Sequence, residues 1–309
     1  MLTKILVGVD ETAGAIDAAE FAEDVARATG ADLLLMTAYQ DPLLPFPLTL
    51  GGSPTQRLHD AEELLRTLRP AHAPHAHTRA LPDFSCSRAL RRTAKAEGAD
   101  LIVLGCAHSA STSAVHIGHT GRQVLHGASC AVALVAAGYR QTPRALGRVV
   151  VGLDGGPESV RALRVATQLA MATGAEISAV CVLDDRVPLV WTPVGLSAEL
   201  ARWDETMKRR HDRIAARVQE LVPDRDGVGS EIVVGDPVEQ LARAAAESDL
   251  LVLGSRSWGR PGHISLGSTA DALCHGSPCS VLIVPRPDPA VSVPLGAAEA
   301  ASTANGVRR

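Results

Sequence analysis

Short runs of almost purely apolar residues alternate along this chain with longer segments whose apolar positions recur every three or four residues. In the second half, residues 250–253 are a continuous apolar run, which is typical of a strand buried on both faces of a sheet. Leu163, Ala166 and Ala170 instead share one face of a helix that Gly174 is placed to end. The pattern predicts strands at 148–154, 176–182, 231–234, 250–253 and 280–284, and helices from Pro157 and at 197–221, 238–246 and 268–275.

The first half shows the same order of elements. Apolar strands that alternate with helices indicate a parallel sheet covered on both faces, with right-handed crossovers. We therefore expect an α/β fold of two tandem, doubly wound domains, each with a five-stranded parallel sheet. In this half the pattern predicts strands at 4–9, 33–38, 101–104 and 132–135, a weak strand near Thr78, and helices at 16–28, 56–68 and from Ser87.

Matching residues recur at a nearly constant distance along the chain. Asp10 and Asp154 are 144 residues apart, and Gly105 and Gly254 are 149 residues apart. A repeat of this length is a duplicated domain, because solenoid repeats are far shorter. We expect a first domain at 1–139, a second at 147–286, a short linker at 138–147 and a disordered tail at 287–309.

Composition and charge narrow the class of protein. With 46% hydrophobic and 21% charged residues, the 309-residue chain has the composition of a globular protein. The net charge of −4 gives no sign of the excess of basic residues typical of nucleic-acid-binding proteins, so we expect no nucleic-acid partner. Without a secretory signal or a membrane-length apolar stretch, we expect a cytoplasmic protein without membrane contact. The six cysteines show no C-x-x-C spacing, and we expect them to be reduced and mostly buried.

Candidate binding residues lie where strands end, because open parallel sheets bind ligands beyond the carboxyl ends of their strands. An aspartate closes the first strand of each half, Asp10 in one and Asp154 in the other. These carboxylates could contact a ligand or simply accept hydrogen bonds from loop N–H groups.

A glycine-rich loop follows the fourth strand of the second half and leads to Gly267, Ser268 and Thr269. Glycines let a backbone approach phosphate oxygens, and a helix start offers free N–H groups. The two hydroxyls could equally cap the helix without any ligand. Arg256 and Arg260 could pair with phosphates or remain solvated. The loop lacks the G-K-[ST] of a Walker A loop, and neither half has the G-x-G-x-x-G dinucleotide fingerprint.

The segments VVVGLDGGPES, DLLVLGSR and SPCSVLIVP resemble the universal stress protein family, whose nucleotide-binding members carry G-x2-G-x9-G-[ST]. Gly254, Ser257 and Gly267 keep this spacing, with serine at the second glycine. The resemblance covers residues 1–286 and implies an adenine nucleotide α-hydrolase-like, flavodoxin-like fold that binds ATP, with or without Mg²⁺. It also implies that Asp154 accepts a hydrogen bond from the adenine amine, that the main chain at Val182 flanks the base, and that Gly254, Gly267, Ser268 and Thr269 hold ribose and phosphates.

The first half departs further from the family pattern. Its second glycine is replaced by His108, and His119 stands where a hydroxyl residue follows the third glycine. Glu11 adds negative charge beside the strand-end aspartate. We expect weak or absent nucleotide binding here, with His108 and His119 as phosphate donors in the alternative interpretation. The weaker site would comprise Asp10, Ala38, Gly105, His108 and Gly118.

Three functions follow from the resemblance and the residues. The loop has no lysine, and the role of Asp184 and Asp185 is undefined, so no phosphoryl-transfer machinery is recognisable. We expect an ATP-binding, non-catalytic stress-response regulator that binds mainly in the second domain. A slow ATP hydrolase and a nucleotide-independent interaction protein are the alternatives.

Family members pair through their last strands, which implies that residues 132–135 lie beside 280–284 in an internal pseudo-dimer. Further association into a homodimer is left open. We interpret His72, His75 and His77 as part of a polar loop rather than a zinc site, and the charged run from Lys208 as a solvated helix face. We expect an irregular loop at 41–54. Trp258 either packs against the protein or shields the pocket.

Overall fold

The computed structural model describes residues 2–39, 54–106, 115–139, 146–184, 196–222, 228–256 and 259–288, without the side chains of residues 54 and 196–204. His108, Ser257 and Trp258 lie outside the described residues, as do nearly all of the expected loop at 41–54 and of the expected tail. Predictions that concern these residues therefore stay predictions.

The first half contains the five strands that its apolar pattern predicts. Thr12 caps the first helix by accepting a hydrogen bond from the Ala15 N–H, and Gly30 ends it in the left-handed conformation. One short helix before the last strand was not predicted. The elements are β1 (Lys4–Gly8), α1 (Ala13–Thr29), β2 (Asp32–Tyr39), α2 (Pro54–His72), β3 (His77–Pro82), α3 (Cys86–Glu97), β4 (Leu101–Gly105), α4 (His119–Leu125) and β5 (Ala131–Val135).

The second half has the same order. Gly174 ends its first helix with a φ of 77°, as the sequence predicted. The strand near residue 231 begins three residues earlier than expected, at Val228, and the last helix ends two residues earlier, at Leu273. The elements are β6 (Arg148–Gly152), α5 (Pro157–Thr173), β7 (Glu176–Leu183), α6 (Leu196–Leu221), β8 (Val228–Val234), α7 (Pro237–Ala245), β9 (Leu250–Gly254), α8 (Ser268–Leu273) and β10 (Ser280–Val284).

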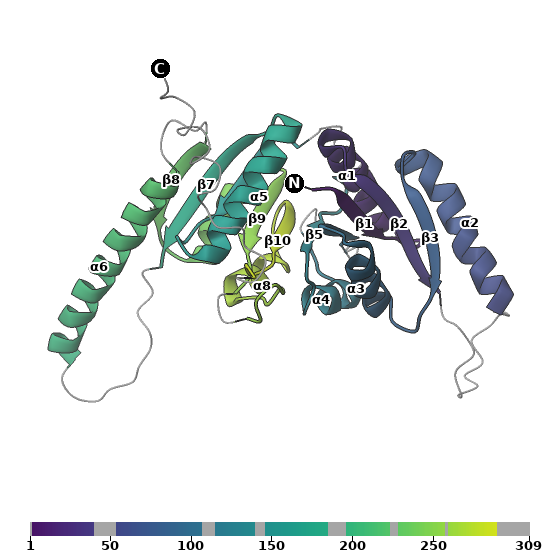
Figure 1. Cartoon of the computed structure of the whole chain (residues 1–309). Coiled ribbons are helices and arrows are strands. Elements are labelled where there is room, and N and C mark those ends of the chain that lie inside the picture. The colour runs from purple at the N-terminus through teal and green to yellow at the C-terminus, as the bar shows by residue number, and fades with distance from the viewer. Residues whose placement is uncertain are drawn as a thin grey trace, which may run out of the picture.

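All ten strands form one sheet in the order β3-β2-β1-β4-β5-β10-β9-β6-β7-β8. Strand pairs within each half are parallel, whereas β5 and β10 pair antiparallel at the centre. Leu134 faces Val281, and Ala133 faces Leu282. The predicted fold class is confirmed, and the last strands of the two halves pair as expected. Figure 1 shows the halves side by side about this junction.

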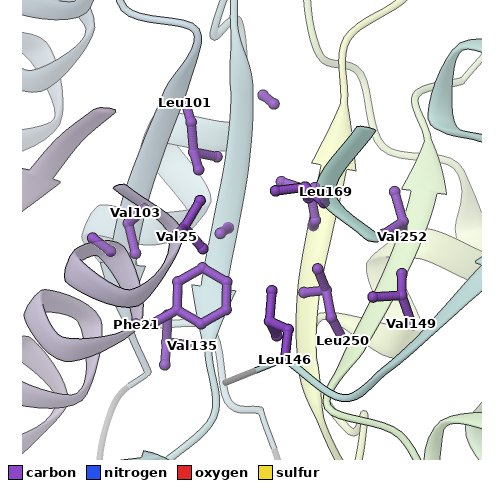
Figure 2. Close-up of a cluster of buried hydrophobic side chains, with 14 of the residues drawn as sticks. Phe21, Val25, Leu101, Val103, Val135, Leu146, Val149, Leu169, Leu250 and Val252 are labelled. Carbon is purple, nitrogen blue, oxygen red and sulfur yellow. The ribbon is translucent and has the colours of Figure 1, made fainter. Parts of the chain in front are cut away.

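Helices cover both faces of the sheet, and each face has a hydrophobic core that runs through both halves. One core lies under α1, α2, α5 and α6, and α1 contacts α5 across the junction. Figure 2 shows side chains of this core from both halves, among them Phe21 of α1, Leu169 of α5 and Leu250 of β9. The other core lies under α3, α4, α7 and α8 and includes Ile102 and Leu251. Because neither core stops at the junction, the halves pack as one unit.

Each half also holds the glycine loop of the other half by main-chain hydrogen bonds. In the first half, the N–H of Ile117 donates to the carbonyl of Cys274, with a distance of 3.1 Å. In the second half, the N–H of Ile264 donates to the carbonyl of Ala128 at 2.8 Å. The residues just before Gly118 and Gly267 are therefore positioned by the partner domain.

Of the three histidines, His75 lies in the expected turn, between α2 and β3, and the other two lie in the flanking elements. His72 ends α2 and His77 begins β3. His72 Nδ1 lies 2.7 Å from a carboxylate oxygen of Glu20, and His75 lies beside Glu23. The sequence showed no acidic companion because Glu20 and Glu23 lie on α1, about fifty residues away. These pairs fasten the end of α2 to α1.

We predict that Leu282→Ala destabilises both halves together. Leu282 is 2% exposed at the centre of the sheet, and truncating such a residue costs about 2–5 kcal/mol. Urea unfolding would be followed by tryptophan fluorescence, which reports only the second half because it contains Trp191, Trp203 and Trp258, and by far-UV circular dichroism, which reports both. We expect coincident transitions that shift together. Two separate steps, with the first-half step unshifted, would contradict this.

Candidate functional site

Two cavities open at the carboxyl ends of the strands, one in each half, at the edge of the sheet where α4 and α8 begin. Figure 1 shows where these two helices lie. The first cavity has a volume of about 450 Å³ and the second about 380 Å³. Both volumes are within the range of small-molecule sites, and both cavities are where a doubly wound sheet binds its ligands.

The second cavity brings together the residues expected to bind a nucleotide. Asp154 from the β6–α5 turn and Val182 from β7 line it on one side. The other side is formed by the start of α8 and the end of β9, with Gly254, Gly267, Ser268 and Thr269. Of the residues predicted for this site, Ser257 alone cannot be placed.

Within the protein, one of the two Asp154 carboxylate oxygens already accepts hydrogen bonds. Its Oδ1 atom accepts hydrogen bonds from Ser159 Oγ at 2.6 Å and from the Gly156 N–H at 2.9 Å. These bonds fix the side chain at the start of α5, in agreement with the interpretation that this carboxylate accepts hydrogen bonds from loop N–H groups. Its Oδ2 atom accepts no bond from the described residues. The fixed carboxylate therefore keeps one acceptor for a ligand.

The two glycines that the loop pattern singled out have different physical roles. A Cβ atom on Gly254 would lie 2.7 Å from the main-chain carbon of Glu158, so glycine is required for α5 to pack against the end of β9. A Cβ atom on Gly267 would meet nothing within 4 Å, and its φ of −83° suits any residue. Packing thus explains the glycine at 254, whereas at 267 the absent side chain leaves space in the cavity.

Ser255 joins the two ends of the glycine loop by a hydrogen bond to Ser265. We did not identify this residue from the sequence. It is 4% exposed, and its Oγ atom accepts a hydrogen bond from the Ser265 N–H at 2.8 Å. The Arg256 N–H in turn donates to the Ser265 carbonyl at 2.7 Å. These bonds hold residues 255 and 256 against Ser265, so the two ends of the loop lie together.

Three basic side chains line the second cavity: Arg256 from the loop, and Arg210 and His211 from α6. The charged run from Lys208 is therefore not only a solvated face, which corrects the sequence interpretation. His211 Nε2 lies 3.2 Å from the carbonyl oxygen of Asp184 and joins α6 to the end of β7. Arg260, the other loop arginine, is exposed and does not line the cavity.

Acidic groups share this cavity with the basic ones. Glu158, at the start of α5, is 6% exposed and lies 3.3 Å from the Arg286 guanidinium, so its charge is paired. Asp184 also lines the cavity. Within the described ranges, no group of three or more His, Cys, Asp or Glu side chains is arranged to hold a metal ion.

The first cavity has the same framework. Asp10, Ala38, Gly105 and Gly118 line it, as predicted for the weaker site. The Asp10 Oδ1 atom accepts hydrogen bonds from the N–H and the hydroxyl of Thr12, and its Oδ2 atom accepts none from the described residues. A formed cavity is therefore present in the half whose loop departs most from the family pattern.

Gly105 repeats the packing role of Gly254. A Cβ atom there would lie 2.0 Å from the Gly14 carbonyl oxygen, so the end of β4 contacts the start of α1 directly. His119 and Thr120 line this cavity as well. The strand-end glycine is thus explained by packing in both halves.

The structure confirms that the cysteines are mostly buried, with one exception. All six are free thiols, and Cys86 is the exposed one. It lines the first cavity at the start of α3. Burial, followed by the nearby Asp10 and Asp83 carboxylates, raises the pKa of this thiol. Pro237 takes the corresponding place in the second cavity.

Comparisons with known proteins all point to the same family. The sequence pattern of the universal stress protein family matches residues 1–136 and 146–285. A universal stress protein of Mycobacterium tuberculosis is 28% identical over 186 residues, which cover 60% of this chain and 61% of that relative. One of Thermus aquaticus is 30% identical over 141 residues, or 44% of this chain and 96% of the relative. The match thus spans less than two thirds of the mycobacterial protein.

Solved structures support the fold. A universal stress protein of Archaeoglobus fulgidus superposes with a TM-score of 0.57 at 18% identity, covering 92% of this chain and 98% of its own. A putative universal stress protein of Pseudomonas aeruginosa gives a TM-score of 0.61 at 18% identity, covering 92% and 93%. Within the described part of the chain, no helix is both long and apolar enough to cross a membrane.

The different roles of the two glycines predict opposite effects on stability. We expect Gly254→Ala to lose about 1–3 kcal/mol or more, because its Cβ would contact the Glu158 backbone. We expect Gly267→Ala to lose less than about 1 kcal/mol, the cost of a poorer N-cap. Urea unfolding of both variants measures this. Equal losses, or a larger loss for Gly267→Ala, would refute the assignment.

Proposed function

Because this chain belongs to the universal stress protein family, we propose that it binds an adenine nucleotide, ATP foremost, in the second cavity and acts as a non-catalytic stress-response regulator. Members of the family commonly bind adenine nucleotides. The composition of the second cavity is the observation that supports the proposal for this chain. The second cavity combines an available carboxylate oxygen, a glycine with open space beside it, and three basic side chains.

The carboxylate end of the cavity suits the base. Asp154 Oδ2 is an acceptor, and adenine carries an amino donor where guanine carries a carbonyl acceptor. The base would lie against β7 at Val182, with the apolar Leu241 and Leu253 also lining the cavity. Since the bonds to Ser159 and Gly156 fix the carboxylate, the acceptor is in place before the ligand arrives.

The glycine end suits the phosphates. The open space beside Gly267 can take oxygen atoms where a side chain would otherwise stand. The Ser268 and Thr269 hydroxyls, and the first N–H groups of α8, can donate hydrogen bonds. Arg256 and Arg210 supply positive charge, and hydrogen bonds between charged groups are the stronger ones. His211 adds a ring that can form hydrogen bonds.

We expect binding without turnover, as the sequence indicates. Phosphoryl transfer needs a positioned nucleophile together with charge neutralisation on the γ-phosphate, and the loop from Gly254 to Gly267 contains no lysine. The bound nucleotide would then act by favouring one conformation or one partner of the protein.

Replacing the available acceptor tests the base site. We predict that Asp154→Asn lowers ATP affinity by about tenfold or more, because an amide N–H replaces one acceptor that faces the amine. Titration calorimetry with ATP measures it. Asp10→Asn, the matched change in the first cavity, should alter ATP affinity less than about twofold.

The same calorimetry can reject the proposal. Wild-type protein that gives no saturable heat with ATP, ADP or AMP at millimolar concentration would overturn it and favour a nucleotide-independent interaction protein. ATP hydrolysis that disappears in Asp154→Asn would favour the slow hydrolase instead.

The two loop arginines provide a matched pair for the phosphate site. We predict that Arg256→Ala weakens ATP binding about three- to tenfold and AMP binding less, because an exposed charge pair contributes modestly and acts mainly on the outer phosphates. Arg260→Ala removes the same charge from the same loop, outside the cavity, and should leave the affinity nearly unchanged. Equal effects of the two substitutions would show that only overall charge matters.

A further inference from the structure

The two cavities share one framework but differ in charge. Each has an aspartate whose Oδ2 atom accepts no hydrogen bond from the described residues, a strand-end glycine, and a glycine before a short helix. The second cavity also contains Arg210, His211 and Arg256, whereas no lysine or arginine is among the residues that line the first. The ligand that each can hold should differ accordingly.

The sequence of the two loops shows the same contrast over their full length. Between Gly105 and Gly118 there is no lysine or arginine, whereas Arg256 and Arg260 lie between Gly254 and Gly267. The strand-end aspartate is followed by Glu11 in the first half and by Gly155 in the second. Both differences make the first cavity less favourable for an anion.

His119 lines the first cavity, and the protein itself occupies one of its ring nitrogens. Its Nε2 atom lies 2.8 Å from the Gln123 amide nitrogen, which can only donate. The oxygen of the same amide accepts a hydrogen bond from Ser87 Oγ at 2.6 Å. This ring nitrogen is thus already engaged within the protein, and no lysine or arginine is among the residues that line the cavity beside it. Asp10 is the carboxylate of the first cavity among the described residues that line it.

The remaining wall suits an uncharged, partly aromatic molecule. Val9, Leu90 and Leu104 give apolar surface, and the hydroxyl residues Thr37 and Thr120 also line the cavity. Thr37, which is 7% exposed, stands on β2 at the place that Cys181 takes on β7. A carboxylate acceptor, an apolar wall and hydroxyl groups match an amino-bearing base with a neutral sugar.

We propose that the first cavity is a binding site for an uncharged nucleoside-type ligand and that it rejects the phosphorylated forms of the same ligand. Phosphate groups would enter a cavity whose carboxylate, Asp10, is also negative, with no lysine or arginine among the described lining residues to offset them. The duplication then gives one chain two sites of different selectivity. This proposal does not depend on nucleotide binding in the second cavity.

Cys86 provides a reporter for occupancy of this cavity. It is the exposed cysteine, and the other five are buried, so N-ethylmaleimide should modify Cys86 first in the folded protein. Because Cys86 lines the first cavity, a ligand bound there should slow the modification. The rate would be followed by intact mass, with the modified residue located by peptide mapping.

We expect saturating adenosine to slow modification of Cys86 by about fivefold or more, and ATP at the same concentration by less than about twofold. Asp10→Asn should abolish protection by adenosine, and Asp154→Asn should preserve it. Equal protection by ATP and adenosine, or no protection by adenosine at millimolar concentration, would overturn the proposal. If ATP gives no binding heat in calorimetry while adenosine still protects Cys86, only the function proposed for the second cavity is rejected.

A gain-of-charge variant tests the selectivity independently of Asp10. His119 is exposed at the start of α4, so His119→Arg should fold while placing a permanent cation beside the first cavity. We expect ATP and AMP to protect Cys86 in this variant although they do not in the wild type. If protection by AMP in His119→Arg stays at the wild-type level, the charge argument fails.

Discussion

The antiparallel pairing of β5 with β10 is the interaction on which the rest of the structure depends. It joins two parallel sheets into one and removes the exposed edge that each half would otherwise present. It also brings the end of α8 against the residues before Gly118, and Ile264 against the residues after α4. Each cavity is lined by residues of its own half, but the residues just before Gly118 and Gly267 in its wall are held by main-chain contacts from the other half.

Within that framework, backbone packing and ligand chemistry place different demands on similar residues. Gly105 and Gly254 are needed because a helix start contacts the end of a strand, with or without a ligand. Asp10 and Asp154 each use one oxygen to order a turn, and in the described part of the chain the other oxygen accepts no hydrogen bond. What differs between the halves is the surrounding charge, which packing does not fix and which could diverge after duplication without loss of the fold.

The fold was largely predictable from the sequence because it depends on local periodicity and on a repeat. Apolar runs located most of the strands, a weaker signal indicated the strand near Thr78, and the family resemblance implied that the last strands pair. The site was only partly predictable. Arg210 and His211 reach the second cavity from α6, and Ser255 acts through Ser265. Such contacts depend on how a helix crosses a sheet or a loop closes, which spacing along the chain does not encode.

The number of ATP molecules bound per chain tests the central claim most directly, namely that duplication preserved two cavities while only the second kept the charge for a nucleotide. Equilibrium dialysis of the whole protein against labelled ATP measures this number. The account predicts one bound ATP per chain, lost in Asp154→Asn and retained in Asp10→Asn. Two per chain, or one that is lost in Asp10→Asn instead, would contradict it.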